Sequence, residues 1–338
     1  MENLSQSASS AWAPFRIEPR FDERVWGSRD LRPWYNVTAG SGEPIGETWL
    51  TGDACVAATG PHAGQTLGEL FAEAPESLLG SSAPHNSQAP ASSPSPLLIK
   101  VIFAREKLSV QVHPDDAMAQ KYGDPRGKTE CWYALEAEPG AQVACGLKPG
   151  VTLDDIRKGI ETGTLEASLN LLDVTKGDVI FVDAGTVHAI WPGSILLETQ
   201  QNCDLTYRMY DYGRGRELHI EKSLEATRLA TRAGKVRPKS LSGRTILIDG
   251  DYFRVERIPV AGGRASASLS GEDEPVPGLQ YLFAAAGAAR IAGLGFEPVE
   301  LPKGGIAAVP AASPGFAVED SSDLDLIRIT PRWPGAKR

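Results

Sequence analysis

Hydrophobic and polar positions alternate over short stretches in most of the chain, which is the pattern of half-buried β-strands rather than of long helices. From residue 97 onward such stretches recur, separated by Gly and Pro turns. They are residues 97–103, 108–113, 130–137, 142–147, 178–184, 194–199, 205–212, 252–260, 279–286, 305–311 and 324–329. Many short strands with frequent turns predict a mainly β chain built on a jelly roll or sandwich, with few helices, rather than a doubly wound sheet.

Three segments instead carry apolar residues in helical spacing: 64–80, 151–170 and 217–233. Residues 81–96 are mostly Ser, Pro and Ala, so we predict a mobile surface loop there, with His85 as an exposed side chain without a role. We expect two domains. Residues 1–235 form a jelly roll with helical additions, and residues 236–338 form a smaller β domain, whose sequence contains no histidine.

The composition is that of an ordinary globular protein, with 41% hydrophobic and 23% charged residues among 338. The formal net charge of −9 argues against nucleic acid as the main partner, because binding to the phosphate backbone uses clustered Lys and Arg. It leaves room for a small anionic ligand, since a few basic residues in one pocket can override the overall sign.

The four cysteines stand far apart without a CxxC pair, so we expect reduced, partly buried thiols rather than a thiolate metal site. The N-terminal segment lacks the basic and apolar regions of a signal peptide. The sequence contains no run of about 18 apolar residues, so we expect no membrane span. These features predict a cytoplasmic enzyme without a membrane partner.

The segment LSVQVHPDD alternates so that Ser109, Gln111 and His113 share one face of a strand, opposite two valines. A polar face of this kind suggests a lined cavity. Pro114 suits the first turn of a short helix that follows. Taken alone, His113 could equally be a structural histidine at a strand end.

Two further segments carry the same kind of chemistry. In GKTECWYAL, Lys128 and Glu130 alternate onto one face, with Trp132 continuing it, although a plain ion pair is the simpler interpretation. In KGDVIFVDAGTVHAI, an apolar strand ends in a tight turn, and His188 emerges just beyond it.

Together these residues form a pattern that none of them forms alone. Two imidazoles and one carboxylate match a catalytic zinc site, which leaves a position for water or substrate, and the amide oxygen of Gln111 could be a fourth protein ligand. Nitrogen and oxygen ligands discriminate weakly among metals, so Mn, Fe or Co stay open as alternatives.

These segments resemble the type I mannose-6-phosphate isomerase family, a branch of the cupins, in its compact bacterial form. The matching stretches are PFRIEPRFDERVWG, IGETWL, PLLIKVIFAREKLSVQVHPDD, GKTECWYAL, KGDVIFVDAGTVHAI and ILLETQQNCDLTYRMYDYGR, which follow the family order between residues 14 and 216. The resemblance implies a cupin-like jelly-roll barrel followed by a second, smaller β-sandwich or degenerate cupin domain. Gln111 stands where other cupins have a histidine, which fits the isomerase branch rather than the oxygenases.

The resemblance also implies roles for individual residues. One zinc ion per chain would be bound by Gln111, His113, Glu130 and His188. The catalytic candidates are Arg208, Lys128 and Glu198, and the substrate-binding candidates are Lys100, Ser109 and Trp26. Arg208 could instead be a structural arginine paired to Asp211 or Asp204. Lys128 and Glu198 are both candidates for the catalytic base, and the sequence does not choose between them.

The reaction that this resemblance implies interconverts mannose 6-phosphate and fructose 6-phosphate through a cis-enediol. The partner would be a small sugar phosphate, and the chain a monomer or weak homo-oligomer. Two other functions stay open: another metal-dependent cupin enzyme, such as a dioxygenase, and a cupin that binds sugar without catalysis. Metal content separates the last of these, since a binding module could be metal-free.

Overall fold

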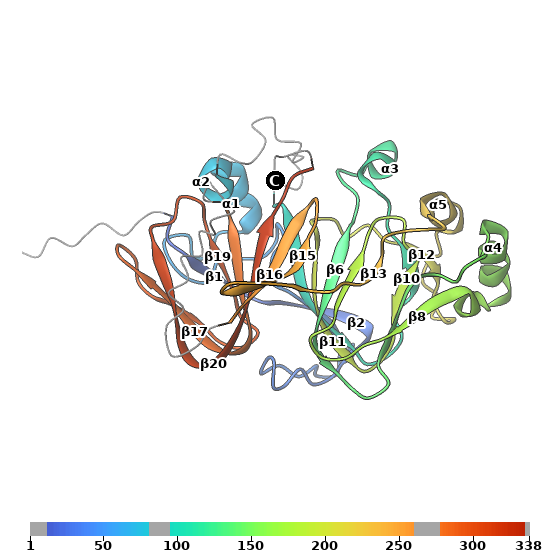
Figure 1. Cartoon of the computed structure of the whole chain (residues 1–338), viewed down its shortest axis with the longest axis horizontal. Helices are drawn as coiled ribbons and strands as arrows, with labels where there is room; N and C mark the ends of the chain where they lie inside the picture. Colours follow the sequence, from blue (N-terminus) through green and yellow to red (C-terminus); the bar gives the residue numbers. More distant parts are fainter. Residues whose placement is uncertain (1–11, 81–94, 260–277, 335–338) are drawn as a thin grey trace, which may run out of the picture. The chain divides into compact units, whose positions relative to one another are not determined.

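A computed structural model describes residues 12–80, 95–259 and 278–334 (Figure 1). The chain forms two compact units. The first takes Met1–Pro19, Leu50–Ser95 and Pro238–Arg338, and the second takes Arg20–Trp49 and Pro96–Arg237. These units differ from the predicted domains, which kept residues 1–235 together. The reason is strand pairing: β1 (Phe15–Ile17) pairs antiparallel with β19 (Ile306–Val309), so the start of the chain groups with its end.

The second unit contains two antiparallel sheets. The strands of the larger sheet are β2 (Arg20–Ser28), β3 (Ile45–Trp49), β4 (Leu97–Ala104), β6 (Glu130–Ala137), β9 (Val179–Val182), β11 (Ser194–Gln201) and β13 (Gly234–Lys235). Those of the smaller sheet are β5 (Val110–Val112), β7 (Gln142–Leu147), β8 (Leu169–Asp173), β10 (His188–Ile190) and β12 (Tyr207–Tyr210). Their spatial orders are β13-β9-β6-β11-β4-β3-β2 and β12-β5-β10-β7-β8. The predicted mainly β fold is confirmed.

An apolar core joins the two sheets of the second unit. Buried Trp132, Ile180 and Leu196 of the larger sheet belong to one cluster with Val143 and Ile190 of the smaller sheet. Such a core fixes the spacing of the sheets, so that polar side chains on the same inner faces are held at defined separations.

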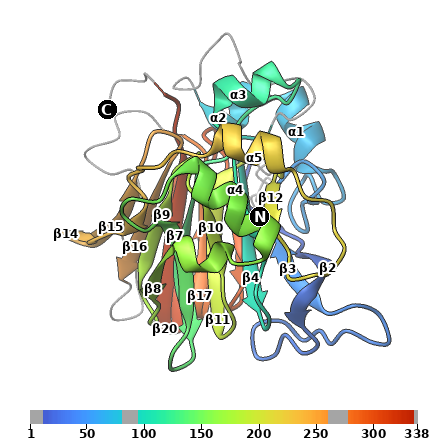
Figure 2. The same cartoon turned by 90° about the vertical axis from the view of Figure 1, so that its right-hand side faces the viewer.

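The outer face of the smaller sheet is covered by α4 (Leu153–Thr162) and α5 (Ile220–Ala226), which Figure 2 shows beside these strands. Ile156 and Ile160 of α4 and Leu224 of α5 pack in one cluster with Val110 and Val112. This second core explains why the valines of LSVQVH point outward while its polar residues point inward.

The helices are shorter than their sequence patterns suggested. The predicted helix over 151–170 ends at Thr162, because Gly163 takes a left-handed conformation with φ of 69°, and a 3₁₀ turn, Leu165–Ser168, follows it. The pattern over 217–233 gives only α5. The pattern over 64–80 gives α1 (Leu67–Glu73) and α2 (Pro75–Leu79).

A short helix, α3 (Asp116–Lys121), follows β5, as the sequence suggested. Its N-cap is Asp115, whose side chain accepts a hydrogen bond from the backbone of Met118, so Pro114 precedes the helix rather than lying in its first turn.

The first unit contains an eight-stranded antiparallel sheet. Its path runs β1-β19-β17-β20-β16-β15-β14, and β18 pairs with β17. The remaining strands are β14 (Lys239–Leu241), β15 (Arg244–Asp249), β16 (Phe253–Pro259), β17 (Gln280–Gly293), β18 (Val299–Leu301) and β20 (Phe316–Pro331). Leu282, Ile291 and Leu326 lie in its apolar core.

Residues 81–94 of the predicted loop, including His85, lie outside the described residues. All four cysteines, Cys55, Cys131, Cys145 and Cys203, are buried thiols outside any disulfide. Among the described residues, none of the helices has the length and apolar character needed to cross a bilayer.

Candidate functional site

Strand pairing in the smaller sheet aligns three of the predicted site residues in one row. Gln111 of β5 lies directly opposite Arg208 of β12 on one side and His188 of β10 on the other. Directly opposite residues of antiparallel strands project from the same face. The row Arg208–Gln111–His188 therefore follows from the register of three short strands.

The larger sheet carries a second polar row. Glu198 of β11 lies opposite Lys100 of β4 on one side and Trp132 of β6 on the other. Glu130 stands two residues before Trp132 on β6, so it shares that face. Residues from segments far apart in the sequence are thus gathered between the two sheets.

The two histidines each turn one unprotonated ring nitrogen toward the cluster. His113 Nδ1 lies 2.8 Å from the carbonyl of Leu205, and His188 Nδ1 lies 2.9 Å from the carbonyl of Thr186. A carbonyl oxygen only accepts, so both Nδ1 atoms carry the proton and both Nε2 atoms are left as acceptors. Backbone partners of this kind orient metal-binding histidines.

Both Nε2 atoms face the same carboxylate. They lie 3.6 Å (His113) and 3.4 Å (His188) from the oxygens of Glu130. One ligand atom from each of the three residues lies within 4.8 Å of the others, and all three side chains are buried. Neither Glu130 oxygen has a well-aligned hydrogen-bond donor among the described residues; its nearest cation is Lys128 Nζ, 3.1 Å away.

The electrostatics of these groups suit a cation. Burial, and then Lys128, lower the pKa of His113 well below its usual value, and burial lowers that of His188 to about 4. Burial, and then the nearby Glu198, raise the pKa of Glu130 to about 8. Neutral imidazoles are the form that ligates a metal, and a buried carboxylate that resists ionisation even beside Lys128 has less positive charge around it than its own charge requires. The cluster therefore fits a divalent metal ion.

Gln111 reaches the same cluster with the nitrogen of its amide. Gln111 Nε2 lies 3.2 Å from His188 Nε2 and 3.5 Å from His113 Nε2, while its Oε1 accepts from Ser109 Oγ at 3.2 Å. An amide nitrogen has no lone pair for a metal. The side chain would become the predicted fourth ligand when its amide turns over, which exchanges nitrogen and oxygen.

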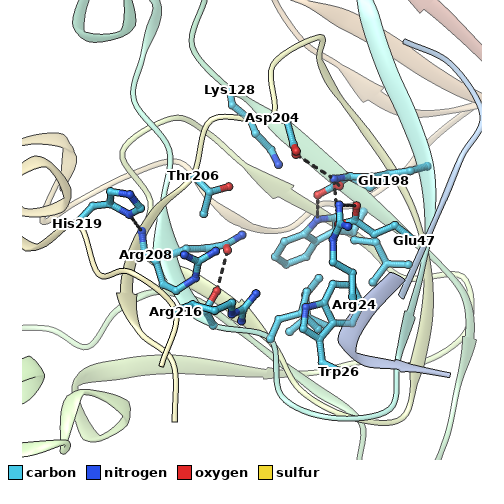
Figure 3. A pocket seen from close by; sticks show the side chains of 17 residues that line it. Arg24, Trp26, Glu47, Lys128, Glu198, Asp204, Thr206, Arg208, Arg216 and His219 are labelled. Carbon is cyan, nitrogen blue, oxygen red and sulfur yellow. Dashed lines mark hydrogen bonds and ion pairs between the residues drawn. The ribbon is translucent and has the colours of Figure 1, made fainter. Parts of the chain in front are cut away.

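A cavity of about 340 Å³ adjoins this cluster and is lined by Gln111 and Lys128. One wall is a buried network of charges (Figure 3). Lys100 Nζ lies 2.9 Å from Glu198 and 3.4 Å from Glu47, and Trp132 Nε1 donates to Glu198 at 3.0 Å.

The ion pairs in this wall determine whether Lys100 and Glu198 are charged. Burial opposes the charge on Lys100, but Glu198 and then Glu47 outweigh it and raise the pKa of Lys100. Burial likewise opposes the charge on Glu198, yet Lys100 and then Lys128 lower the pKa of Glu198. Lys100 and Glu198 are therefore both charged and already partnered.

The opposite side of the cavity is basic. Figure 3 shows Arg208, Arg216 and His219 there. Arg208 Nη1 donates to the carbonyl of Glu217 at 3.0 Å, and its backbone N–H donates to His219 Nδ1 at 3.2 Å. Burial, and then Arg216, lower the pKa of Arg208. Within the described part of the chain, no carboxylate comes within 4 Å of the Arg208 guanidinium.

The alternative of a structural Arg208 paired to Asp211 or Asp204 is therefore wrong. Asp211 is occupied by Arg216, whose Nε donates to it at 2.8 Å, and Asp204 lies 3.9 Å from Lys100. The corner holds the two guanidinium charges of Arg208 and Arg216 against the one carboxylate of Asp211, so it keeps net positive charge and can accept an anion.

All ten predicted site residues are brought together in the second unit. Trp26, Lys100, Ser109, Gln111, Lys128, Glu198 and Arg208 line the cavity, and His113, Glu130 and His188 form the adjoining cluster. Sequence reasoning missed six charged or hydrogen-bonding residues of the lining: Arg24, Glu47, Asp204, Thr206, Arg216 and His219. Glu47 lies in the stretch IGETWL, but only the pairing of β3 with β4 brings it to Lys100.

Comparisons with known proteins identify the relatives of this chain. The family model "Phosphomannose isomerase type I, catalytic domain" matches residues 14–146. A probable mannose-6-phosphate isomerase of Bacillus subtilis, GmuF, is 34% identical over 272 residues, which are 75% of this chain and 82% of that protein. The mannose-6-phosphate isomerase of Streptococcus mutans is 35% identical over 262 residues, 74% of this chain and 79% of that protein.

The chain belongs to the type I mannose-6-phosphate isomerase family.

Family membership extends over nearly the whole length. A putative mannose-6-phosphate isomerase of Bacillus subtilis, YvyI, is 31% identical over 338 aligned residues, 94% of this chain and 99% of that protein. The crystal structure of a mannose 6-phosphate isomerase from Bacillus subtilis matches with a TM-score of 0.80 and 29% identity, covering 94% of this chain and 99% of that one. The cupin-type fold expected for a mannose-6-phosphate isomerase of this family is confirmed.

Proposed function

We propose that the chain is a zinc-dependent aldose–ketose isomerase that interconverts mannose 6-phosphate and fructose 6-phosphate through a cis-enediol. The observation that carries the proposal is one cavity that joins a His–Glu–His donor set to a corner of two arginines. A metal site alone would suit many reactions, and an arginine pair alone would suit any anion. Their combination suits a substrate with a carbonyl at one end and a phosphate at the other.

His113, Glu130 and His188, joined by Gln111 once its amide is turned, would bind the metal. When bound, zinc supplies Lewis acidity that stabilises negative charge developing on the substrate oxygens at C1 and C2. Two nitrogen donors and a carboxylate are a set that zinc commonly takes in catalytic sites, which supports zinc over the harder cations.

Arg208 and Arg216 would bind the phosphate, with Thr206 as a hydroxyl donor at the same corner. This differs from the assignment of Lys100 to substrate binding, because Lys100 already lies between Glu198 and Glu47. Lys100 would act on the substrate through Glu198, by keeping that carboxylate charged. Ser109 and Trp26 line the cavity and would contact the sugar.

Lys128 is the better placed of the two base candidates. Burial alone favours its neutral amine, but Glu130 at 3.1 Å and then Glu198 together outweigh burial and raise the pKa of Lys128. Once the charge of Glu130 is shared with a cation, burial would favour the neutral amine, which can take a proton from carbon. Glu198 is deprotonated, but its lowered pKa makes it a weak base.

A coupled assay of zinc-loaded protein converting mannose 6-phosphate to fructose 6-phosphate tests the proposal. Turnover should vanish in a chelator and return with zinc. Absence of turnover in the zinc-loaded protein would refute the activity, and full turnover in protein shown to contain no metal would refute the metal dependence.

We further propose that this enzyme acts in the cytoplasm on free sugar phosphate.

The assignment of the base has its own test. Lys128→Met should abolish turnover and the exchange of the substrate C2 proton with solvent, while metal content is retained. Glu198→Gln should reduce turnover less. If exchange persists in Lys128→Met and is lost in Glu198→Gln, Glu198 is the base instead.

A further inference from the structure

A cluster outside the cavity fastens the loop that carries Arg216. This loop, residues 211–219, joins β12 to α5. Arg216 lines the cavity, but its position depends on Asp211, which is 4% exposed and accepts from Arg216 Nε at 2.8 Å. The direction in which Arg216 points is therefore set by the conformation of the loop at Asp211 and at the residue after it.

That next residue, Tyr212, has a strained backbone. Its φ is 56°, in the left-handed region that a tyrosine rarely adopts. Such a conformation persists only where the surroundings impose it, and strain of this kind is common at functional sites. The contacts that hold Tyr212 therefore also hold the loop.

Glu166 provides the main contact. It lies on the 3₁₀ turn after α4, where its Oε1 accepts from the Tyr212 hydroxyl at 2.8 Å. The same carboxylate binds Lys107 Nζ, at 2.6 and 2.9 Å. The ammonium of Lys107 lies 4.5 Å from the ring centre of Trp191 and 5.3 Å from that of Tyr212. We call Glu166, Lys107 and Tyr212 the clasp.

The clasp contacts three segments of the cavity wall without lining the cavity itself. Lys107 precedes Leu108, and Trp191 follows Ile190; both of these neighbours line the cavity. Arg214 on the loop donates to the carbonyl of Lys107 at 2.8 Å, a second tie between the loop and this segment. Loss of Glu166 would therefore release the strained turn on one side and the Lys107 segment on the other.

From this geometry we infer that Glu166 is a positioning residue for substrate binding, which fixes the Tyr212 turn and thereby holds Arg216 at the cavity as a phosphate ligand. The role of Arg216 rests on the proposed function. The inference predicts an effect of Glu166 on binding of the phosphate group, transmitted through Arg216, and little effect on the chemical step.

The test compares Glu166→Ala with Glu138→Ala, in which an exposed glutamate of the same unit loses its partner Arg105. For Glu166→Ala, the KM for mannose 6-phosphate and the inhibition constant of inorganic phosphate should each rise about tenfold, the size of one lost charge-assisted hydrogen bond. The kcat should stay within about twofold. Glu138→Ala should change neither constant, and Glu166→Gln, which can still accept from Tyr212, should recover part of the loss.

A double-mutant cycle with Arg216→Ala separates positioning from general loosening. If Glu166 acts through Arg216, Glu166→Ala should add little to the KM of the Arg216→Ala protein. A full additional tenfold rise there, or a fall in kcat without a change in KM, would overturn the inference. So would an inhibition constant for phosphate that Glu166→Ala leaves unchanged.

Calorimetry of inorganic phosphate binding to the metal-loaded protein distinguishes a failure of the proposed activity from a failure of the clasp inference. If the wild-type protein fails to isomerise mannose 6-phosphate but Glu166→Ala weakens phosphate binding through Arg216, the proposed activity fails and the clasp stands. If the wild-type protein binds no phosphate, the clasp inference is overturned, whatever the enzyme turns over.

Discussion

Two buried carboxylates, one in each unit, show how differently the chain uses buried charge. In the first unit Glu256 on β16 is fully buried and lies directly opposite Arg328 on β20, which is 1% exposed. Arg328 Nε donates to Glu256 at 2.7 Å, and Arg244 Nε lies 3.3 Å from the other oxygen. Cations therefore lie near both oxygens of this carboxylate, although only Oε2 accepts a well-aligned hydrogen bond.

Glu130 of the second unit is equally buried but incompletely partnered. One lysine lies beside it at 3.1 Å, and its other polar neighbours include the Nε2 lone pairs of two neutral histidines and the carboxylate of Glu198. Acceptors that face acceptors gain nothing from one another, so the ionised form of Glu130 costs stability unless a cation binds between these groups.

The comparison shows that burial of charge alone does not mark a site. Glu256 is a structural group because its strand register supplies its partners, whereas Glu130 is left short of positive charge beside a cavity. Three predictions test this difference.

The largest effect is expected from the histidines. His113→Ala or His188→Ala should lose bound metal and reduce kcat/KM by about 1000-fold or more, since Lewis-acid stabilisation is worth several kcal/mol. His62→Ala is the matched control, because His62 bonds to Gln65 in the other unit. Metal analysis and the coupled assay measure both quantities. Retention of stoichiometric metal by both histidine variants would disprove the assigned ligands.

The next effect concerns stability. Glu256→Gln removes the charge that Arg328 and Arg244 share at this carboxylate, which should lower the free energy of unfolding by about 3 kcal/mol. Urea denaturation of the zinc-loaded protein measures this. The double variant Glu256→Leu/Arg328→Met should recover most of the loss, because an apolar pair needs no partner. A loss below about 1 kcal/mol in Glu256→Gln would mean that the pair is not a structural requirement.

The smallest effect is expected in the number of protons that are released when zinc binds. The pKa of Glu130 is raised to about 8, so the metal-free protein should hold that proton at pH 7 and lose it as pH rises above 8. Zinc binding should therefore release about one proton more at pH 7 than at pH 9. Calorimetry in buffers of different ionisation enthalpy measures the release. A release that is unchanged from pH 7 to pH 9, or that persists in Glu130→Gln, would contradict this account.

Much of this site could be predicted from local sequence. Alternation in LSVQVH and in KTECW put Gln111 and His113, and Lys128 and Glu130, on inner faces, because side chains on a strand alternate whatever the rest of the chain does. The strands could be predicted in the same way, because they are short apolar runs bounded by turn residues.

The other features of the site depend on which strands pair with one another, and local sequence does not specify this. Lys100 was expected to bind substrate, but the register of β4 against β3 and β11 supplies it with two carboxylates. Arg216 and His219 were missed because they lie on a loop, where alternation carries no information. The domain boundaries differed for the same reason, since the partner of β1 lies almost 300 residues along the chain.

The metal content of Glu130→Gln and Glu256→Gln, purified side by side with the wild type, tests the central claim most directly. The account predicts about one zinc per chain in the wild type and in Glu256→Gln. It predicts little or none in Glu130→Gln, with turnover following the metal. Stoichiometric zinc and full turnover in Glu130→Gln would contradict it, because the carboxylate left short of positive charge would then not be the one that binds the ion.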